Sequence, residues 1–278
     1  MAAPLLLGCD FSSSPSRQKT IVIATGRLVD AGVVLSNLEY FTSLDAWAAR
    51  LAQPGERWVG GFDMPFGLPR ELVQALGWPT DWAACIDHYQ SLSRADIRST
   101  FKAFCAARPV GQKFAHRATD GPAGSSPSMK WVNPPVAYML HAGVPLLRQA
   151  GVYLPGLMPL PARPPERVAL EAYPGLLARA VLGRRSYKSD DKARQTPDRL
   201  DARQALLAAL EAGQYAGLRL QLAAAQRALL VSDARGDSLD AVLCLLQAAW
   251  ALQQHQQGAP LYGLPPDMDP LEGWIVGA

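Results

Sequence analysis

Several features that assign other sequences to a class are scarce or absent here. No apolar run reaches the roughly 18–20 residues that a membrane-spanning helix needs, which argues against a membrane protein. Charge of one sign is also scarce, since 27 basic and 24 acidic side chains leave a net charge of only +3, which argues neither for nor against nucleic acid. The four cysteines stand far apart, without a C-x-x-C pair. This spacing argues against a zinc site and is typical of reduced thiols in the cytoplasm, where we expect the protein.

The apolar residues, nearly half (49%) of the 278, follow a pattern that predicts an α/β fold. Short apolar or β-branched runs that end at turn residues predict strands over 4–11, 19–28, 33–41, 57–63 and from 167 up to Pro174. Helical spacing of apolar residues predicts helices over 45–52, 175–182, 198–229 and 238–254. Residues 85–165 show no regular pattern, so we expect a long irregular insertion within one domain that spans residues 1–278.

Acidic side chains stand at unusual places in this pattern. Asp10, Asp63 and Glu171 each end an apolar strand, and Asp240 lies in an apolar helix one turn after Asp237. A carboxylate in such surroundings is costly to desolvate unless it is paired, hydrogen-bonded or bound to a metal. Because the carboxyl ends of neighbouring strands meet at one edge of a sheet, the three strand-end acids can converge there, opposite the start of the helix. The sequence therefore predicts an all-oxygen metal site, which suits Mg²⁺ or Mn²⁺.

Each of these acids also has a purely structural interpretation. Asp237 stands where helix N-caps stand, and Asp240 would then lie in a first turn that favours negative charge. Asp10 and Asp63 precede turn-forming residues, and Glu171 can pair with an arginine. The joint pattern favours the metal site, because three strand-end acids and a helical Asp-x-x-Asp seldom arise as unrelated turns.

Several segments resemble known proteins. Gly-Cys-Asp10-Phe-Ser before a hairpin resembles the first strand of ribonuclease H-like nucleases, which carries their first metal-binding aspartate. Further segments are similar to one group in particular, at 61–69, 116–120, 131–135, 170–174, 186–188, 236–241 and 272–275. That group is domain-of-unknown-function family 429, usually described as predicted nucleases of the ribonuclease H-like fold. The resemblance spans almost the whole chain.

The resemblance implies a mixed five-stranded sheet in the order 3-2-1-4-5 with helices on both faces. It implies that Asp10 lies on the first strand, Asp63 at the end of the fourth, and Asp237 or Asp240 on the last helix. Holliday-junction resolvases of this fold use an acid near the end of the fourth strand and an Asp-x-x-Asp helix as ligands, which these residues match. Glu171 departs from that ligand set, so a role beside the metal or specific to this group is expected for it.

The predicted reaction is hydrolysis of phosphodiester bonds by two divalent ions, Mg²⁺ or Mn²⁺, about 3.5–4 Å apart. In this hypothesis Asp10 bridges the two ions, while Asp63 and Asp240 each complete the ligands of one. Asp237 or Glu171 would orient water or a ligand.

The substrate is less well indicated. Lys113, Arg117 and Lys188 are the candidate phosphate ligands, with solvated surface charge as the alternative. Nucleic acid fits the site, but residues 188–194 alternate in sign and form no clean basic stripe, so a small phosphorylated substrate stays open. Two other functions also stay open: an ATP-binding phosphotransferase of the related actin-like fold, and a non-catalytic protein that binds a partner through 85–165. Nothing in the sequence points to an oligomeric state.

Overall fold

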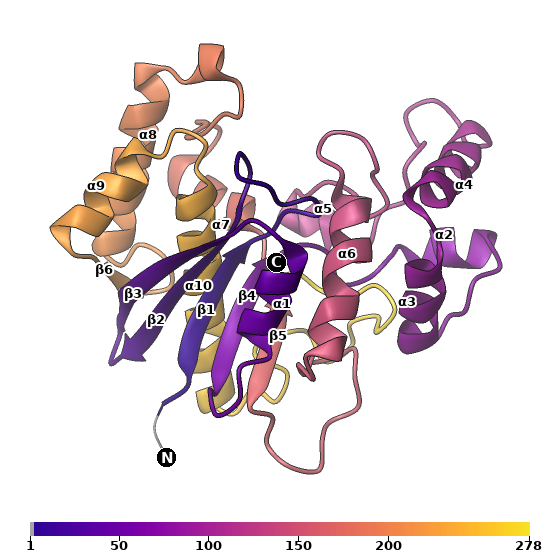
Figure 1. Cartoon of the computed structure of the whole chain (residues 1–278), viewed down its shortest axis with the longest axis horizontal. Coiled ribbons are helices and arrows are strands. Elements are labelled where there is room, and N and C mark those ends of the chain that lie inside the picture. Colours follow the sequence, from indigo (N-terminus) through magenta and orange to yellow (C-terminus); the bar gives the residue numbers. More distant parts are fainter. Residues whose placement is uncertain (1–2) are drawn as a thin grey trace.

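The computed structural model describes residues 3–278, and within them a six-stranded mixed sheet lies between two layers of helices (Figure 1). The strands are β1 (Leu5–Asp10), β2 (Ile21–Val29), β3 (Gly32–Phe41), β4 (Trp58–Asp63), β5 (Arg167–Glu171) and β6 (Arg219–Gln221). Their order is β5-β4-β1-β2-β3-β6, with β1, β2 and β3 antiparallel and the other neighbours parallel. This is the ribonuclease H-like topology, so the predicted α/β fold is confirmed, with the short β6 added beside β3.

Two groups of helices cover the two faces of the sheet. One group packs with a core that includes Leu7 and Cys9, and consists of α1 (Leu44–Leu51), α2 (Arg70–Ala75), α3 (Trp82–Ser91), α4 (Arg94–Ala106) and α6 (Val136–Gln149). The other packs with a core that includes Leu6, and consists of α7 (Pro174–Leu182), α8 (Pro197–Glu211), α9 (Ala224–Ser232) and α10 (Asp237–Gln256). Successive residues of a strand point to opposite faces, so β1 contributes to both cores.

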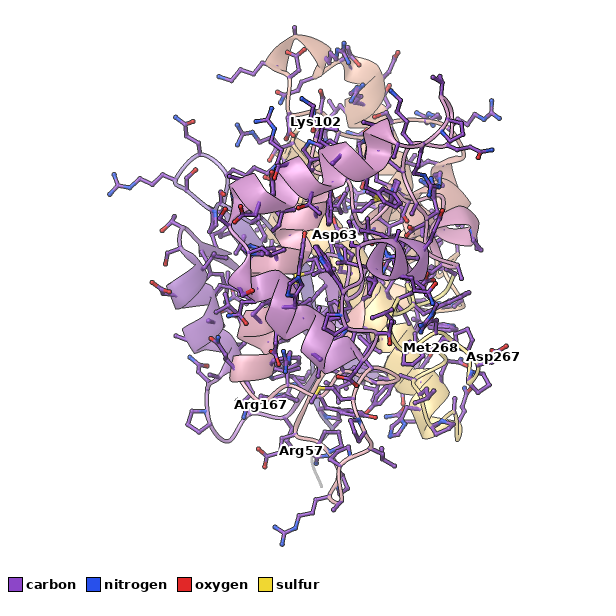
Figure 2. All side chains as sticks on the ribbon, turned by 90° about the vertical axis from the view of Figure 1, so that its right-hand side faces the viewer. Arg57, Asp63, Lys102, Arg167, Asp267 and Met268 are labelled. Carbon is purple, nitrogen blue, oxygen red and sulfur yellow. The ribbon has the colours of Figure 1, made fainter. Side chains whose placement is uncertain are left out.

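Helix α10 is the central helix of its layer. Its side chains are buried almost all round from Ser238 to Leu252, as expected for a helix that is apolar on every side. It packs across β1, β2 and β4 and also contacts α7. The helix therefore begins directly over the carboxyl ends of the two central parallel strands. Figure 2 shows the direction of β4, with Arg57 at its start near the bottom and Asp63 at its end higher up.

The irregular structure expected at 85–165 is wrong, because α3, α4, α6 and the short α5 (Asp120–Ala123) occupy much of the segment. That the segment is an insertion within one domain stays a prediction. In α4 the buried residues Ile97, Phe101 and Cys105 are separated by charged residues, and a proline at position 145 lies inside α6. Both features hide the helical period. Side chains of these helices belong to the same hydrophobic core as side chains of β1 and β4.

The single predicted helix at 198–229 is also wrong. Helix α8 ends at Glu211, and the chain turns through Gly213 (φ 79°) and Gly217 (φ 75°) before it forms β6 and then α9. Glycine adopts these positive φ angles without steric strain, which permits the turn. The four cysteines are buried free thiols. Within residues 3–278, none of the helices combines the length and the hydropathy required to cross a bilayer.

Candidate metal centre

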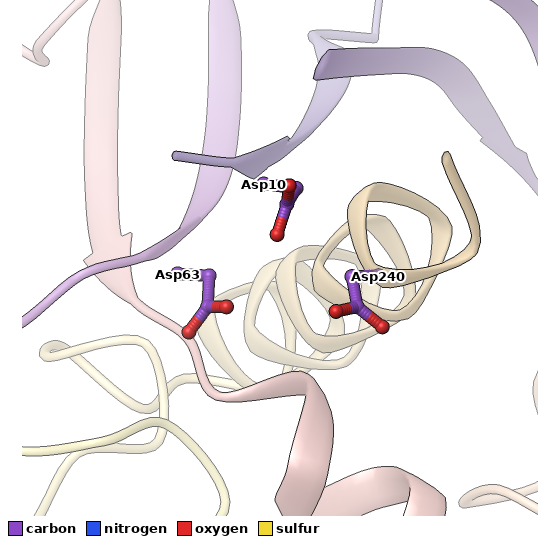
Figure 3. Close-up of side chains that lie close together, drawn as sticks. All are labelled: Asp10, Asp63 and Asp240. Atoms are coloured by element: carbon purple, nitrogen blue, oxygen red, sulfur yellow. The ribbon is translucent and has the colours of Figure 1, made fainter. Parts of the chain in front are cut away.

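Three of the predicted acids converge at the carboxyl edge of the sheet (Figure 3). Asp10 and Asp63 stand opposite each other on the parallel strands β1 and β4, and Asp240 lies in the first turn of α10. One carboxylate oxygen of each lies within 4.8 Å of the other two. Asp10 is 9% exposed and Asp240 is fully buried. The three side chains form a compact group of hard oxygen donors that could hold a metal ion.

Two glycines allow α10 to come close enough for this convergence. Gly8 stands two residues before Asp10 and therefore on the same face of β1. A Cβ at Gly8 would lie 2.0 Å from the carbonyl oxygen of Ala241 and 2.2 Å from the backbone nitrogen of Leu245. Gly61 has the same relation to Asp63, and its Cβ would lie 2.5 Å from the carbonyl oxygen of Cys244. The helix backbone thus rests directly on the two strands that carry the acids.

The Gly8→Ala variant is expected to lose about 1–3 kcal/mol of unfolding free energy, because α10 must move away from β1 to admit the methyl group. The same movement separates Asp240 from Asp10, so stabilisation by Mg²⁺ should shrink as well. Urea unfolding with and without Mg²⁺ measures both effects. Gly121→Ala is the control, because nothing lies within 4 Å of the added carbon. Equal stability of the two variants would contradict this account of the packing.

The start of α10 is shaped by a carboxylate that the sequence analysis missed. Gly236 takes the N-cap position with φ 79°, and the Asp233 side chain accepts hydrogen bonds from the backbone nitrogens of Gly236 (3.1 Å) and Ser238 (2.8 Å). Asp237 is therefore the first helical residue and leaves the capping to Asp233. Its side chain lines the same cavity as Asp10, although it is outside the three-carboxylate group.

The site carries more negative charge than its own residues neutralise. Burial, followed by the charge of Asp240, raises the pKa of Asp10 well above its usual range. The same two causes raise the pKa of Asp63 to about 7. Burial also raises the pKa of Asp240, although the nearby charge of Lys188 opposes that shift. Crowded, buried carboxylates of this kind fit a divalent cation, which removes the repulsion that raises their pKa values.

Lys188 and Tyr187 both contact the Asp240 carboxylate. The Lys188 ammonium forms an ion pair with Asp240 Oδ2, and the Tyr187 hydroxyl donates to Asp240 Oδ1 at 2.5 Å. The Lys188 Nζ also lies 5.8 Å from the centre of the Tyr187 ring. Lys188 was predicted as a phosphate ligand and does reach the site. Tyr187 carried no chemical signal of its own in the sequence, because a lone tyrosine beside charges is unremarkable.

Glu171 lies on the opposite face of the sheet from the three aspartates. It pairs in register with Phe62 on β4, so it shares the face of Phe62, one residue before Asp63. Its carboxylate forms an ion pair with Arg117 (2.6 Å) and accepts the Phe66 backbone N–H at 2.9 Å. Glu171 thus pairs with an arginine, which was the structural alternative to a place in the metal site.

The other predicted phosphate ligands lie in different surroundings. Arg117 is 3% exposed, and its guanidinium also forms an ion pair with Asp120 at 2.9 Å. Lys113 is exposed and lines neither of the cavities beside the carboxylates. Among the predicted basic residues, Lys188 is the one that the fold brings to the clustered aspartates.

Two cavities meet at the carboxylate cluster. The larger, of about 520 Å³, opens over Asp10 and Asp63, and its walls carry four cations, Lys19, Arg94, Lys188 and Arg235, and two further acids, Asp190 and Asp237. The smaller, of about 210 Å³, shares Asp63 and Lys188 with the first, and it is lined also by Arg117, Glu171 and several apolar side chains. The cations of the larger cavity, next to the clustered aspartates, suit an anionic ligand that is held together with a divalent ion.

The comparisons with known proteins agree with one part of this picture. The model of a family described as "Protein of unknown function (DUF429)" matches residues 145–265. This segment carries Lys188, Asp237 and Asp240, while Asp10 and Asp63 precede it. Neither a curated protein nor a solved structure matches the chain. The predicted resemblance to domain-of-unknown-function family 429 is thus confirmed over residues 145–265.

Proposed function

We propose that the protein is a metal-dependent nuclease, which hydrolyses phosphodiester bonds with two divalent ions held by Asp10, Asp63 and Asp240. The convergence of three carboxylates within 4.8 Å, beside a cavity that Asp10 and Asp63 line together with four cations, carries this proposal. Carboxylates from the first strand, the fourth strand and the last helix also suit the ribonuclease H-like topology. Fold alone does not establish an activity, so the carboxylate site supports the proposal more strongly than the topology does.

Each residue has a defined task in the proposed reaction. Mg²⁺ or Mn²⁺, when bound, supplies the charge that activates water and stabilises the leaving oxygen. In this proposal Asp10 would bridge the two ions, and Asp63 and Asp240 would each complete the ligands of one. Asp237, on the cavity wall, orients a water molecule. Lys188, which reaches both cavities, contacts the phosphate of the substrate.

Glu171 and Arg117 act through other residues in this proposal. Glu171 accepts the backbone N–H of Phe66, just after Asp63, and so holds the turn that follows β4. Arg117 neutralises Glu171 and keeps it in that position. Lys113 lies outside both cavities and takes no part in the proposed substrate contacts.

A panel of substrates tests the proposal. Single strands, duplexes, RNA–DNA hybrids and four-way junctions are incubated with Mg²⁺, Mn²⁺ or EDTA, and products are separated on denaturing gels. We expect cleavage of at least one substrate that requires the metal and is lost in Asp240→Asn. Asp267→Asn, an exposed position at the right-hand edge of the molecule in Figure 2, is the matched control and should keep full activity. Cleavage that persists in EDTA, or in Asp240→Asn, would exclude this site as its source.

A further inference from the structure

Helix α4 carries a stripe of three cations. Arg94, Arg98 and Lys102 are exposed and recur at every fourth residue, so they follow one side of the helix. The buried residues of α4, Ile97 and Phe101 among them, face the protein core instead. We call the three cations the α4 basic face. The sequence alone does not reveal this stripe, because residues 85–165 show no regular apolar pattern that predicts a helix.

The α4 basic face has no acidic partner within the protein. In the part of the chain that the structure describes, no carboxylate lies within 4.0 Å of Arg94, Arg98 or Lys102, and Arg94 bonds only to neutral oxygens of Ser13 and Ser14. A groove runs along this side of the helix, with walls formed by Arg94, Ala95, Arg98, Ser99, Lys102 and Tyr138. The groove is therefore cationic and lacks any acid that would repel an anion.

This groove continues into the cavity above the carboxylate cluster. Arg94 and Tyr138 line both. The Arg94 guanidinium stacks over the Tyr138 ring at 5.1 Å from its centre, and the Tyr138 hydroxyl donates to the Arg94 carbonyl at 3.3 Å. Arg94 is thus held at the junction of the groove and the cavity. An anionic chain that occupies the groove leads directly towards Asp10 and Asp63.

We infer that the α4 basic face binds the sugar–phosphate backbone of a polynucleotide and guides it to the carboxylate cluster. The inference rests on the proposed function for its substrate. From Arg94 to Lys102 the helix rises about 12 Å, which corresponds to roughly three to four nucleotides along one strand. Ala95 and Ser99, between the cations, offer no large apolar side chain that could enter a membrane. The groove therefore fits a phosphate backbone better than a lipid surface.

Binding without cleavage is the first test. Fluorescein-labelled 20-nucleotide single strands and duplexes are titrated with the protein in EDTA, and anisotropy is measured at several salt concentrations. K is the association constant for the nucleic acid. In Arg98→Gln/Lys102→Gln, we expect the plot of log K against log[salt] to be less steep than for the wild type, by about 1.4 for single strands or about 1.8 for duplexes. At 0.1 M salt this corresponds to binding that is weaker by roughly 25-fold for single strands.

A matched control removes the same charge elsewhere. Arg27 and Arg163 are exposed at the other end of the sheet, near the starts of β1 and β5, and Arg27→Gln/Arg163→Gln should bind as the wild type does. In Figure 2, Lys102 lies near the top of the molecule, while Arg167 at the start of β5 lies near the bottom. Equal affinity and salt slope in the two double variants would overturn the inference. So would preferential binding of the wild type, through α4, to phosphatidylserine vesicles.

A small substrate separates this inference from the proposed function. Hydrolysis of bis(4-nitrophenyl) phosphate with Mn²⁺ needs the carboxylates but no extended groove, so Arg98→Gln/Lys102→Gln should hydrolyse it at the wild-type rate. Loss of polynucleotide binding with this rate unchanged supports the inference. If the wild type binds polynucleotide through α4 but hydrolyses neither substrate, the inference stands and the proposed function fails. If the small diester is hydrolysed but the α4 variant binds polynucleotide normally, the inference alone fails.

Discussion

The Asp10→Asn variant is expected to lose catalysis and gain stability at once. Diester hydrolysis should fall by about 10³, because loss of a metal ligand removes several kcal/mol of transition-state charge stabilisation and 1.36 kcal/mol corresponds to tenfold. Without metal, however, the same substitution removes a buried charge that the other two carboxylates repel. An amide of the same shape has no such repulsion. The expected cost to function and gain in stability arise from the same crowding.

The gain in stability should depend on pH. Burial and the charge of Asp240 raise the pKa of Asp10 in the folded protein above its value in the unfolded chain. The folded state therefore binds the proton more tightly, and the stability that this contributes is present at low pH and is lost as the pH rises. The same holds for Asp63, whose pKa is raised to about 7. Metal-free wild-type protein should lose stability between pH 4 and pH 8, and Asp10→Asn should lose less.

Thermal unfolding in EDTA at pH 4, 6 and 8 measures this difference. We expect Asp10→Asn to have the higher Tm at pH 8, by about 2–4 °C for each kcal/mol gained, and nearly the wild-type Tm at pH 4. Added Mg²⁺ should raise the Tm of the wild type at pH 8 and leave that of the variant almost unchanged. Asp267→Asn is the control and should follow the wild type throughout. A variant less stable than the wild type at pH 8 in EDTA would show that the three carboxylates do not repel one another.

The convergence of the acids could be predicted from sequence because local rules determine it. Asp10 and Asp63 each follow an apolar strand, and parallel neighbours end at the same edge of a sheet. Gly8 and Gly61 stand two residues before these acids, a pattern that is visible in the sequence but gains meaning only once α10 is known to lie on that face. The close approach of α10 depends on residues far apart in the sequence. It therefore cannot be predicted from the pattern of the strands alone.

The role of Glu171 shows where such rules fail. A shift of one residue in strand register exchanges the two faces of a sheet, and the sequence shows only that Glu171 ends its strand. Pairing with Phe62 instead of Asp63 turns it away from the aspartates. Its partner Arg117 lies 54 positions earlier, in a segment whose helices the sequence analysis did not recognise. Interactions over such separations depend on the packed structure.

The Arg117→Met variant is expected to lose about 3–5 kcal/mol of unfolding free energy, the range typical when one partner of a buried ion pair is removed. Arg117, Asp120 and Glu171 are each at most 3% exposed, so the substitution leaves two carboxylates buried without their cation. Urea unfolding measures the loss. Arg194→Met is the control, because its ion pair with Asp191 is solvent-exposed and contributes about 1 kcal/mol at most.

Arg117→Met should also weaken metal binding at the carboxylate cluster. Arg117 donates to the carbonyl oxygen of Glu272, and the Glu272 carboxylate accepts the backbone N–H of Arg70, at the start of α2. Together with the Glu171 contact to Phe66, these bonds hold the turn that follows Asp63. Mg²⁺ should therefore stabilise the variant less than the wild type. Adding Glu171→Gln to Arg117→Met should restore part of the stability, because one unpaired buried charge disappears. It should not restore the stabilisation by Mg²⁺, because the turn after Asp63 stays unsupported. A full wild-type response to Mg²⁺ in Arg117→Met would show that the buried pair stabilises the fold without positioning Asp63.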